Sequence, residues 1–290
     1  MSNGEPDVSG WIGRSEETQD RITPGPLNRL SATLDTKEQP FTSGDVIPPL
    51  SHWLFFLPQT PQSELGADGH AKRGGFIPAL PGFPRRMWAG SRLTFLGDLR
   101  VDDDLVRLSR IVSVKPKTGA SGNMVFVTVR HEYNRPGEPP SLIDEHDIVY
   151  RSLEAPAVTP APRKMEAGPW HRSLTPDPVM LFRYSALTFN GHRIHYDRDY
   201  VKGQEGYPGL IVHGPLIATL LVDLIRRNAP AVRINSFSFR AVSTLFDGVE
   251  MSVNASLPDA HGVITLWAAN AEGGLAMSAE ARVSRGENSA

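Results

Sequence analysis

The chain has 290 residues, no cysteine and a formal net charge of −2 at pH 7. This length suits one large domain or two ordinary ones. The absence of cysteine excludes disulfides, thiolate catalysis and every cysteine-based zinc motif. A net charge so close to zero lacks the basic footprint of a nucleic-acid-binding protein, so we expect no nucleic-acid partner.

The first ten residues, MSNGEPDVSG, are polar and acidic. They match neither a secretory signal nor a mitochondrial presequence, and we expect residues 1–10 to form a disordered tail. No apolar run approaches the roughly 20 residues that a membrane-spanning helix needs. The sequence therefore predicts a cytoplasmic protein with no membrane partner.

Residues 11–150 form a first block that is rich in turns and strands. A short helix is expected at 26–34. Alternating or β-branched stretches predict strands at 91–99, 105–114, 123–133 and 141–151. Residues 151–175 that follow are rich in Pro and Ala without apolar periodicity, which is typical of a surface linker.

The second block, residues 176–285, contains the longest predicted helix, at 214–227. Pro215 suits the first turn of a helix, and Pro230 ends it. The interior, LIATLLVDLI, is apolar on nearly every side, which indicates a buried helix. Strands are predicted after it at 234–242, 249–257, 262–270 and 275–283.

The two blocks show a weak internal duplication. A shift of 144 residues aligns four similar pairs, Phe95 with Phe239, Val101 with Leu245, Asp103 with Asp247 and Leu105 with Val249. A long buried helix followed by antiparallel strands predicts an α+β fold in which a sheet wraps around a helix. Two such units in tandem would pair as one pseudo-dimer.

Residues 182–216 concentrate the chemistry-bearing side chains. The segment holds three histidines, three clustered acids and a Gly-Pro helix start, namely His192, His195, His213, Asp197, Asp199, Glu205, Gly214 and Pro215. Histidine is the side chain whose pKa lies nearest neutrality, which makes it the usual proton carrier. TFNGHRIHYD resembles the hydratase motif of the MaoC-like (R)-specific enoyl-CoA hydratases, and VHGPLIATLL resembles their central hot-dog helix.

The resemblance covers residues 11–285 and points to a two-hot-dog subgroup. This subgroup includes mitochondrial hydroxyacyl-thioester dehydratase type 2 and hydratases for itaconyl-, mesaconyl- or 3-methylfumaryl-CoA. The first half matches through PPLSHWLFFLP, KRGGFIPALP and RRMWAGSRLTF. It implies a tandem hot-dog fold with an N-terminal domain at 11–150 that is catalytically degenerate, and a C-terminal domain at 176–285 that carries the motif.

The motif departs from the family pattern at two positions. The pattern runs Asp, any residue, Asn, Pro, an aliphatic residue and His, with an Asp two positions later. His195 and Asp197 match it, but Asn190 stands at the usual Asp and His192 at the usual Asn. An amide exchanges no proton near neutral pH, although it can hold a water molecule.

The resemblance implies a role for each residue that matches the motif. His195 is the expected base, the Gly214 N–H would stabilise an enolate, and Asn190 would orient the water or the thioester. For the second proton transfer, His195 acting alone is preferred, with Asp197 or Glu205 as alternatives.

Substrate binding needs cations for the CoA phosphates and for an acidic acyl group. His192 is either a pocket residue or a turn residue, and His213 is expected to orient the helix start. The basic candidates are Lys72, Arg73, Arg85 and Arg86 for the phosphates, and Arg183 and Arg193 for the acyl group. No metal or redox cofactor is expected, and CoA enters only as part of the substrate.

The predicted function is reversible hydration of an α,β-unsaturated acyl-CoA thioester, with a short branched dicarboxylyl-CoA such as itaconyl- or mesaconyl-CoA preferred. The alternatives are 3-hydroxyacyl-thioester dehydration in fatty acid synthesis, a hot-dog thioesterase, a non-catalytic acyl-CoA-binding module and an iron oxygenase. The oxygenase would use His195 and Asp197 with His213 or His261. A monomer and a homodimer are both compatible with a tandem hot-dog.

Overall fold

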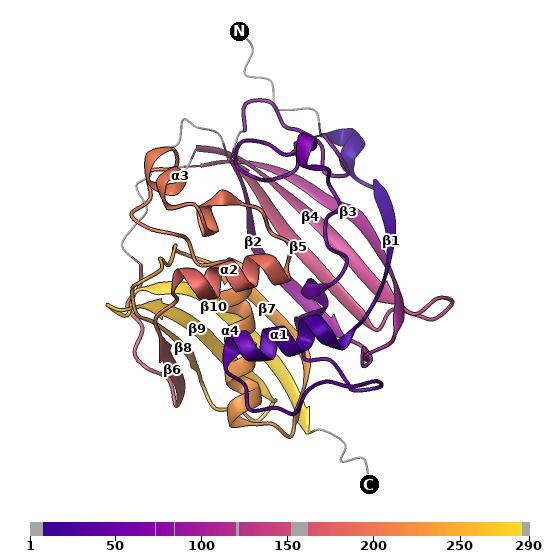
Figure 1. Cartoon of the computed structure of the whole chain (residues 1–290), viewed down its shortest axis with the longest axis vertical. Helices are drawn as coiled ribbons and strands as arrows, with labels where there is room; N and C mark the ends of the chain where they lie inside the picture. Colours follow the sequence, from indigo (N-terminus) through magenta and orange to yellow (C-terminus); the bar gives the residue numbers. More distant parts are fainter. Residues whose placement is uncertain (1–7, 73, 84, 120–121, 152–161, 286–290) are drawn as a thin grey trace.

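The computed structural model describes residues 8–72, 74–83, 85–119, 122–151 and 162–285 (Figure 1). Ten antiparallel strands form one sheet in the order β1-β3-β4-β5-β2-β7-β10-β9-β8-β6. The first half contributes β1 (Ser15–Arg21), β2 (Arg85–Phe95), β3 (Asp104–Gly119), β4 (Gly122–Asn134) and β5 (Leu142–Arg151). The second contributes β6 (Trp170–Leu174), β7 (Val232–Ala241), β8 (Met251–Ala255), β9 (Val263–Asn270) and β10 (Leu275–Arg285).

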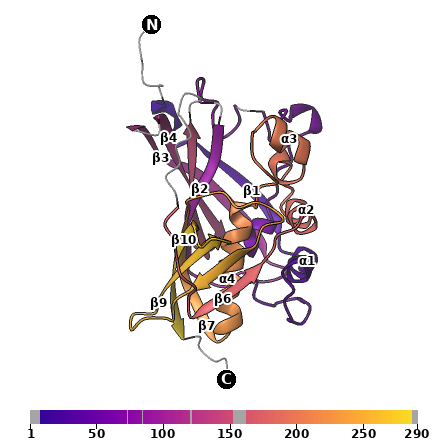
Figure 2. The ribbon, with the colours of Figure 1, turned by 90° about the vertical axis from the view of Figure 1, so that its left-hand side faces the viewer.

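The α-helices all lie on one side of this sheet (Figure 2). They are α1 (Pro24–Leu34), α2 (Pro178–Leu187), α3 (Arg198–Gly203) and α4 (Gly214–Asn228); four single 3-10 turns are η1 (Ser9–Trp11), η2 (Ser51–Leu54), η3 (Gln62–Glu64) and η4 (Arg193–His195). In the described part of the chain, no helix combines the length and the apolar character that crossing a membrane requires.

The two halves meet where β2 pairs with β7. Leu93 lies opposite Phe237 in this pair, and Ser91 lies opposite Phe239. A shift of 144 residues carries Leu93 onto Phe237, the very residue that it faces. A pseudo-twofold axis therefore passes through this pair, which supports the duplication suggested by the sequence.

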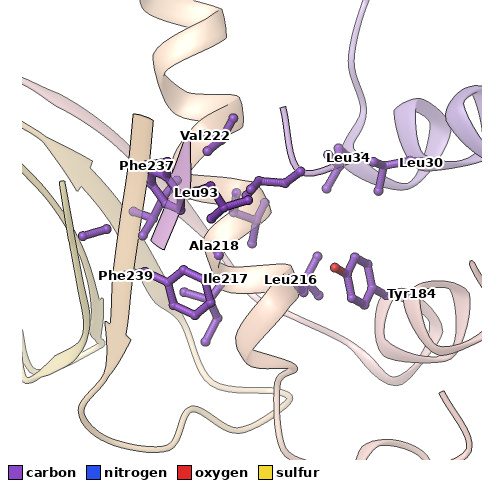
Figure 3. Close-up of a cluster of buried hydrophobic side chains, with 14 of the residues drawn as sticks. Leu30, Leu34, Leu93, Tyr184, Leu216, Ile217, Ala218, Val222, Phe237 and Phe239 are labelled. Carbon is purple, nitrogen blue, oxygen red and sulfur yellow. The ribbon is translucent and has the colours of Figure 1, made fainter. Parts of the chain in front are cut away.

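Helix α4 is the core of the second half. The sequence is apolar around most of its circumference, and Leu216, Leu221 and Ile225 are at most 1% exposed. Figure 3 shows its apolar side chains between the sheet residues Leu93, Phe237 and Phe239 on one side and residues of α1 and α2 on the other. Burial on all sides is what an all-round apolar helix requires.

The described part of the first half contains no equivalent of α4, which corrects the expectation that each half-sheet wraps around a helix. In both halves, an isolated β-bridge joins the chain to the loop that follows the first long strand. Val46 bridges to Arg100 in the first half, and Ile211 bridges to Phe246 in the second. Helix α4 begins shortly after Ile211, whereas among the described residues the short 3-10 turns η2 and η3 follow Val46. Proline cannot occupy a helix interior, and prolines at 48, 49, 58 and 61 interrupt this stretch.

The expected linker at 151–175 contains part of the second sheet. Strand β6 pairs with β8 at its edge, Trp170 opposite Ala255 through Leu174 opposite Met251, while residues 152–161 lie outside the described part. Such a five-residue edge strand leaves no periodic signal long enough to stand out between prolines. Helix α1, predicted at 26–34, begins at Pro24 and packs against α2 instead of filling the first half-sheet.

A substitution at Gly90 tests how tightly the two halves are joined. A Cβ atom at this position would lie 2.2 Å from the carbonyl oxygen of Phe239 on β7. We expect Gly90→Ala to lower the free energy of unfolding by about 1–3 kcal/mol, as overpacking does. Denaturant titration measures it, with Gly203→Ala as the matched control, because a Cβ there meets nothing within 4 Å. Equal stability of the two variants would contradict a tight β2–β7 junction.

Candidate active site

A cavity of about 1160 Å³ lies between the two halves, and both contribute to its wall. The first half supplies residues of 52–71 and of strands β2 to β5, and the second supplies the end of α2 and residues 188–196. Its size slightly exceeds the 300–1,000 Å³ typical of small-molecule sites. The cavity thus occupies the space that a central helix of the first half would have filled.

The end of α2 positions Asn190. The Asn190 N–H donates to Ser185 O at 2.8 Å and the Phe189 N–H to Ala186 O, with Phe189 left-handed at φ 48. These bonds form a Schellman motif, in which glycine usually takes the left-handed position. The Asn190 side-chain oxygen accepts the His192 N–H at 3.0 Å. The Asn190 amide therefore sits on the cavity wall in a conformation fixed by backbone bonds.

His195 is a buried, neutral imidazole. Its Nδ1 lies 2.7 Å from Ile211 O, so Nδ1 carries the hydrogen and Nε2 keeps its lone pair. Burial lowers the pKa of His195 to about 4, against the smaller opposing effect of the hydrogen bond to Ile211. The residue is 7% exposed and set back from the cavity wall. At neutral pH it can act as a base.

His213 connects the start of α4 to α2. Its Nε2 lies 2.8 Å from Ser185 Oγ, and its ring stacks on that of His195 with centroids 3.7 Å apart. Burial holds the pKa of His213 well below its usual range. No side chain caps α4, so the Gly214 N–H stands at an open helix start, where unpaired N–H groups and the positive dipole end coincide. Pro215, next along, lines the cavity.

A loop of the first half covers His192. His70 Nδ1 lies 3.2 Å from Asp68 Oδ2, and the His70 ring lies 4.0 Å from the His192 ring. Burial, with the neighbouring His70 and His195, lowers the pKa of His192 to about 3. Ligand atoms of Asp68, His70 and His192 lie within 4.8 Å of one another, a set that could hold a divalent cation. Sequence analysis missed Asp68 and His70, because no linear signal joins them to the motif.

Arg193 and Asp197 hold loops in place. Arg193 donates to Asp197 Oδ2 at 2.7 Å and to Ala67 O at 3.0 Å, and it lies over the Tyr200 ring. Asp197 also caps α3 by accepting the Tyr200 N–H at 3.0 Å. Arg193 therefore lies on the cavity wall with its guanidinium largely bonded to protein atoms. The Asp197 carboxylate is also bonded within the protein, and among the described residues His195, Asp197 and His213 form no cluster of ligand atoms close enough to hold a metal ion.

The remaining basic candidates are scattered. Arg86 lies on the cavity wall. Arg183 is exposed and Lys72 donates to Ser63 O at 2.9 Å, and neither is part of the wall. Arg73 lies outside the described residues, and of Arg85 only the backbone, at the start of β2, is described.

The first half-sheet carries a buried polar cluster that sequence analysis missed. Asp144 Oδ2 accepts N–H bonds from Trp53 Nε1 at 2.9 Å and His146 Nε2 at 2.7 Å, and lies 3.2 Å from His52 Nε2. Although burial acts to raise it, these histidines hold the pKa of Asp144 well below its usual range. Asp144 and His146 are two residues apart on β5, and this spacing predicts that both side chains lie on the same face of the sheet. Here His146 and His52 reach the cavity.

Comparisons with known proteins agree with this architecture. The family model for hydroxyacyl-thioester dehydratase type 2 matches residues 50–247. Mesaconyl-C(4)-CoA hydratase of Chloroflexus aurantiacus is 46% identical over 83% of this chain and 86% of its own. The mitochondrial hydroxyacyl-thioester dehydratase type 2 of Schizosaccharomyces pombe is 27% identical over 79% of this chain and 85% of its own.

Solved structures confirm the tandem hot-dog fold. A MaoC-like dehydratase matches with a TM-score of 0.71 at 13% identity, over 96% of this chain and 99% of that one. A Mycobacterium tuberculosis protein with a double hot-dog fold matches with a TM-score of 0.55 at 13% identity, over 94% and 96% of the two chains.

The protonation state of His195 can be measured directly. We expect its imidazole to titrate with a pKa of about 4, against about 6.5 for a free histidine, because burial disfavours the cation. NMR titration of imidazole-labelled protein, assigned with a His195→Gln variant, measures the value. Exposed His261 is the internal control. A His195 value as high as that of His261 would contradict the buried geometry.

Proposed function

Because the chain belongs to the hydroxyacyl-thioester dehydratase type 2 family, we propose that it hydrates an α,β-unsaturated acyl-CoA thioester and catalyses the reverse dehydration. The observation that carries this proposal is the neutral His195 beside the uncapped start of α4. A base and an oxyanion donor are two of the three elements that hydration of an enoyl thioester needs; the third is a proton donor for Cα.

The proposed chemistry follows the polarity of the substrate. His195 Nε2 takes a proton from water while the water oxygen bonds to Cβ. The electrons of the double bond move to the thioester oxygen, where the Gly214 N–H stabilises the enolate. A preorganised donor of this kind commonly contributes about 3 kcal/mol. The Asn190 amide, on the cavity wall, holds the water, and no metal or redox cofactor enters the scheme.

A guanidinium with spare donors supports an acidic acyl group. Arg107 on β3 lines the cavity, and its buried Nε has no acceptor. A long hydrogen bond of 3.4 Å joins its Nη1 to Phe56 O, and the guanidinium also interacts with the Phe56 ring and the Tyr133 hydroxyl. Tyr133 faces it from β4, and burial raises the pKa of this hydroxyl, which therefore stays a donor. A carboxylate is the group that Arg binds best.

We therefore propose a short dicarboxylyl-CoA as substrate, in agreement with the mesaconyl group in the name of the 46% identical relative. Arg86 on the cavity wall is the described cation that remains for the CoA phosphates. The cytoplasmic location and the choice between monomer and homodimer remain predictions from sequence.

A panel of enoyl-CoA esters tests the function. Purified protein is assayed with linear and branched, monocarboxylic and dicarboxylic esters, before and after exhaustive chelation. We expect loss of the conjugated-thioester absorbance without release of free CoA, and highest kcat/KM for branched dicarboxylic esters. Free CoA would indicate a thioesterase, and binding without turnover a non-catalytic module. Higher rates on linear 3-hydroxyacyl thioesters would favour the fatty-acid dehydratase.

Gly214→Ala separates the oxyanion role from stability. A Cβ at this position meets no protein atom within 4 Å, and alanine is a better helix former than glycine. We expect an unchanged or slightly higher melting temperature, with kcat/KM lowered at least about 10-fold, because the methyl group would occupy the space of the thioester oxygen. Full activity of this variant would contradict the proposed contact.

Arg107→Met tests the acyl preference. Loss of a charge-assisted bond should lower kcat/KM for dicarboxylic esters about 10- to 100-fold, while monocarboxylic esters keep theirs. Arg110→Met, exposed on the same strand, is the matched control. An equal loss on both ester classes would mean that Arg107 supports the fold and does not read the acyl group.

A further inference from the structure

One proton transfer of the proposed hydration lacks a donor within the motif. The enolate must receive a proton at Cα, and Asn190 stands where the family pattern has an acid. A carboxamide has no proton to give near neutral pH. The donor must therefore come from another side chain on the wall, or from the base itself.

Few titratable groups near Asn190 remain uncommitted. The Tyr196 hydroxyl donates to Gly191 O at 3.0 Å, and burial raises the pKa of Tyr184. Arg193 is bound to Asp197 and Ala67. His70, from the first half, also lines the cavity, and its Nε2 makes no hydrogen bond in the described part of the chain.

Asp68 orients the ring of His70. It accepts the His70 backbone N–H at 3.1 Å through Oδ1 and faces Nδ1 at 3.2 Å through Oδ2. The bond from His70 holds the pKa of Asp68 well below its usual range, so this carboxylate is ionised. A carboxylate on Nδ1 fixes the tautomer and leaves Nε2 to exchange the proton, as in catalytic Asp–His pairs generally.

The His70 loop is fixed to the motif by close contacts. Gly69 adopts φ 86, and a Cβ there would lie 1.9 Å from Gly191 O. The Arg193 N–H donates to Asp68 O at 2.9 Å. The centroids of the His70 and His192 rings lie 4.0 Å apart, and the His192 backbone N–H donates a hydrogen bond to the Asn190 side-chain oxygen. His70 and Asn190 are therefore parts of one rigid constellation.

We propose that His70, oriented by Asp68, is the acid that protonates Cα; this rests on the hydration proposed above. His195 removes a proton from water as the C–O bond forms at Cβ, and the enolate forms at the thioester oxygen. The enolate then takes a proton from Nε2 of the His70 imidazolium as the Cα–H bond forms. His195 has gained a proton and His70 has lost one, and exchange with solvent restores both.

Opposed environments suit the two histidines to opposite roles. His195 is buried and commits its Nδ1 hydrogen to Ile211 O, which leaves Nε2 as a base, whereas His70 has an ionised carboxylate as its partner. Pairs of titratable groups with diverging surroundings are typical of acid–base sites. The charge of His70 lowers the pKa of both His192 and His195, so these are the other titratable groups near it. The charge of Arg86 also lowers the pKa of His192.

The test compares His70→Gln and Asp68→Asn with the exposed control His261→Gln, using the best ester of the panel. We expect His70→Gln to lower kcat about 100-fold or more, the usual range for a general acid, with KM changed less than about 3-fold. The pH profile of kcat is recorded for each variant, and Asp68→Asn should lose less activity than His70→Gln because it keeps the imidazole. Added imidazole should restore turnover to His70→Gly, which a merely structural role would not allow.

Each of the following outcomes would overturn the inference. If wild-type protein hydrates the ester and His70→Gln keeps its kcat, then His195 acts alone and only the inference fails. If His70→Gln raises KM without altering the pH profile, His70 binds substrate. Activity lost on chelation and restored by Zn²⁺ would make Asp68, His70 and His192 metal ligands instead. If wild-type protein hydrates no ester, the proposed function itself fails.

Discussion

The sheet is built from two equivalent halves, but the one central helix, α4, packs mainly against the second. The β2–β7 pairing makes the sheet continuous across the pseudo-twofold axis, so both halves present a face on the same side (Figure 2). Helix α4 covers the second half-sheet with apolar side chains. Among the described residues of the first half, the turn η2 stands in the corresponding place and an apolar cluster around Trp11 and Leu80 covers part of the sheet. The space that remains is the cavity. The site thus follows from an asymmetry between duplicated units.

Because no central helix in the described part of the chain covers it, the first half-sheet has to stabilise polar side chains on its inner face. Part of its inner face carries polar side chains, including Arg107, His146 and Asp144, beside an apolar cluster that contains Val127 and Val129. The second half-sheet has alanine, leucine and phenylalanine on its inner face. A buried carboxylate without partners would be costly, but Asp144 receives hydrogen bonds from Trp53 and His146. These bonds tie η2 to β5 and give the cavity wall a fixed shape without a helix to support it.

The sequence predicted the regular parts of this structure well, for a physical reason. Helix α4 was predicted at 214–227 and spans Gly214–Asn228, because its apolar run and its flanking prolines are local signals. The long strands β3, β4, β5, β9 and β10 likewise carry their own periodicity. Strand β6 and helix α2 were missed, since the first is short and the second has a weakly segregated apolar face.

The candidate site was predictable only where it is local. His195, Asn190 and Gly214 share one motif and its following helix, and the structure brings their segments together. Arg193 was predicted to be a substrate cation and does line the cavity, but its bonds to Asp197 and Ala67 could not be read from spacing. His70 and Arg107 gave no signal at all. Their position on the cavity wall depends on the missing helix of the first half, which is a property of the fold.

The same missing helix bears on why the two units remain in one chain. A symmetric pair of hot-dog units would place two helix starts and two motifs about the axis. Here the second half keeps the helix start and His195, while the first half supplies the loop with Asp68 and His70 and the cation Arg107. Among the described residues, the proposed base His195 belongs to the second half and the Asp68–His70 pair to the first. If the proton transfers proceed as proposed, each half is incomplete alone, and covalent linkage keeps two diverged, complementary surfaces in fixed register along β2 and β7.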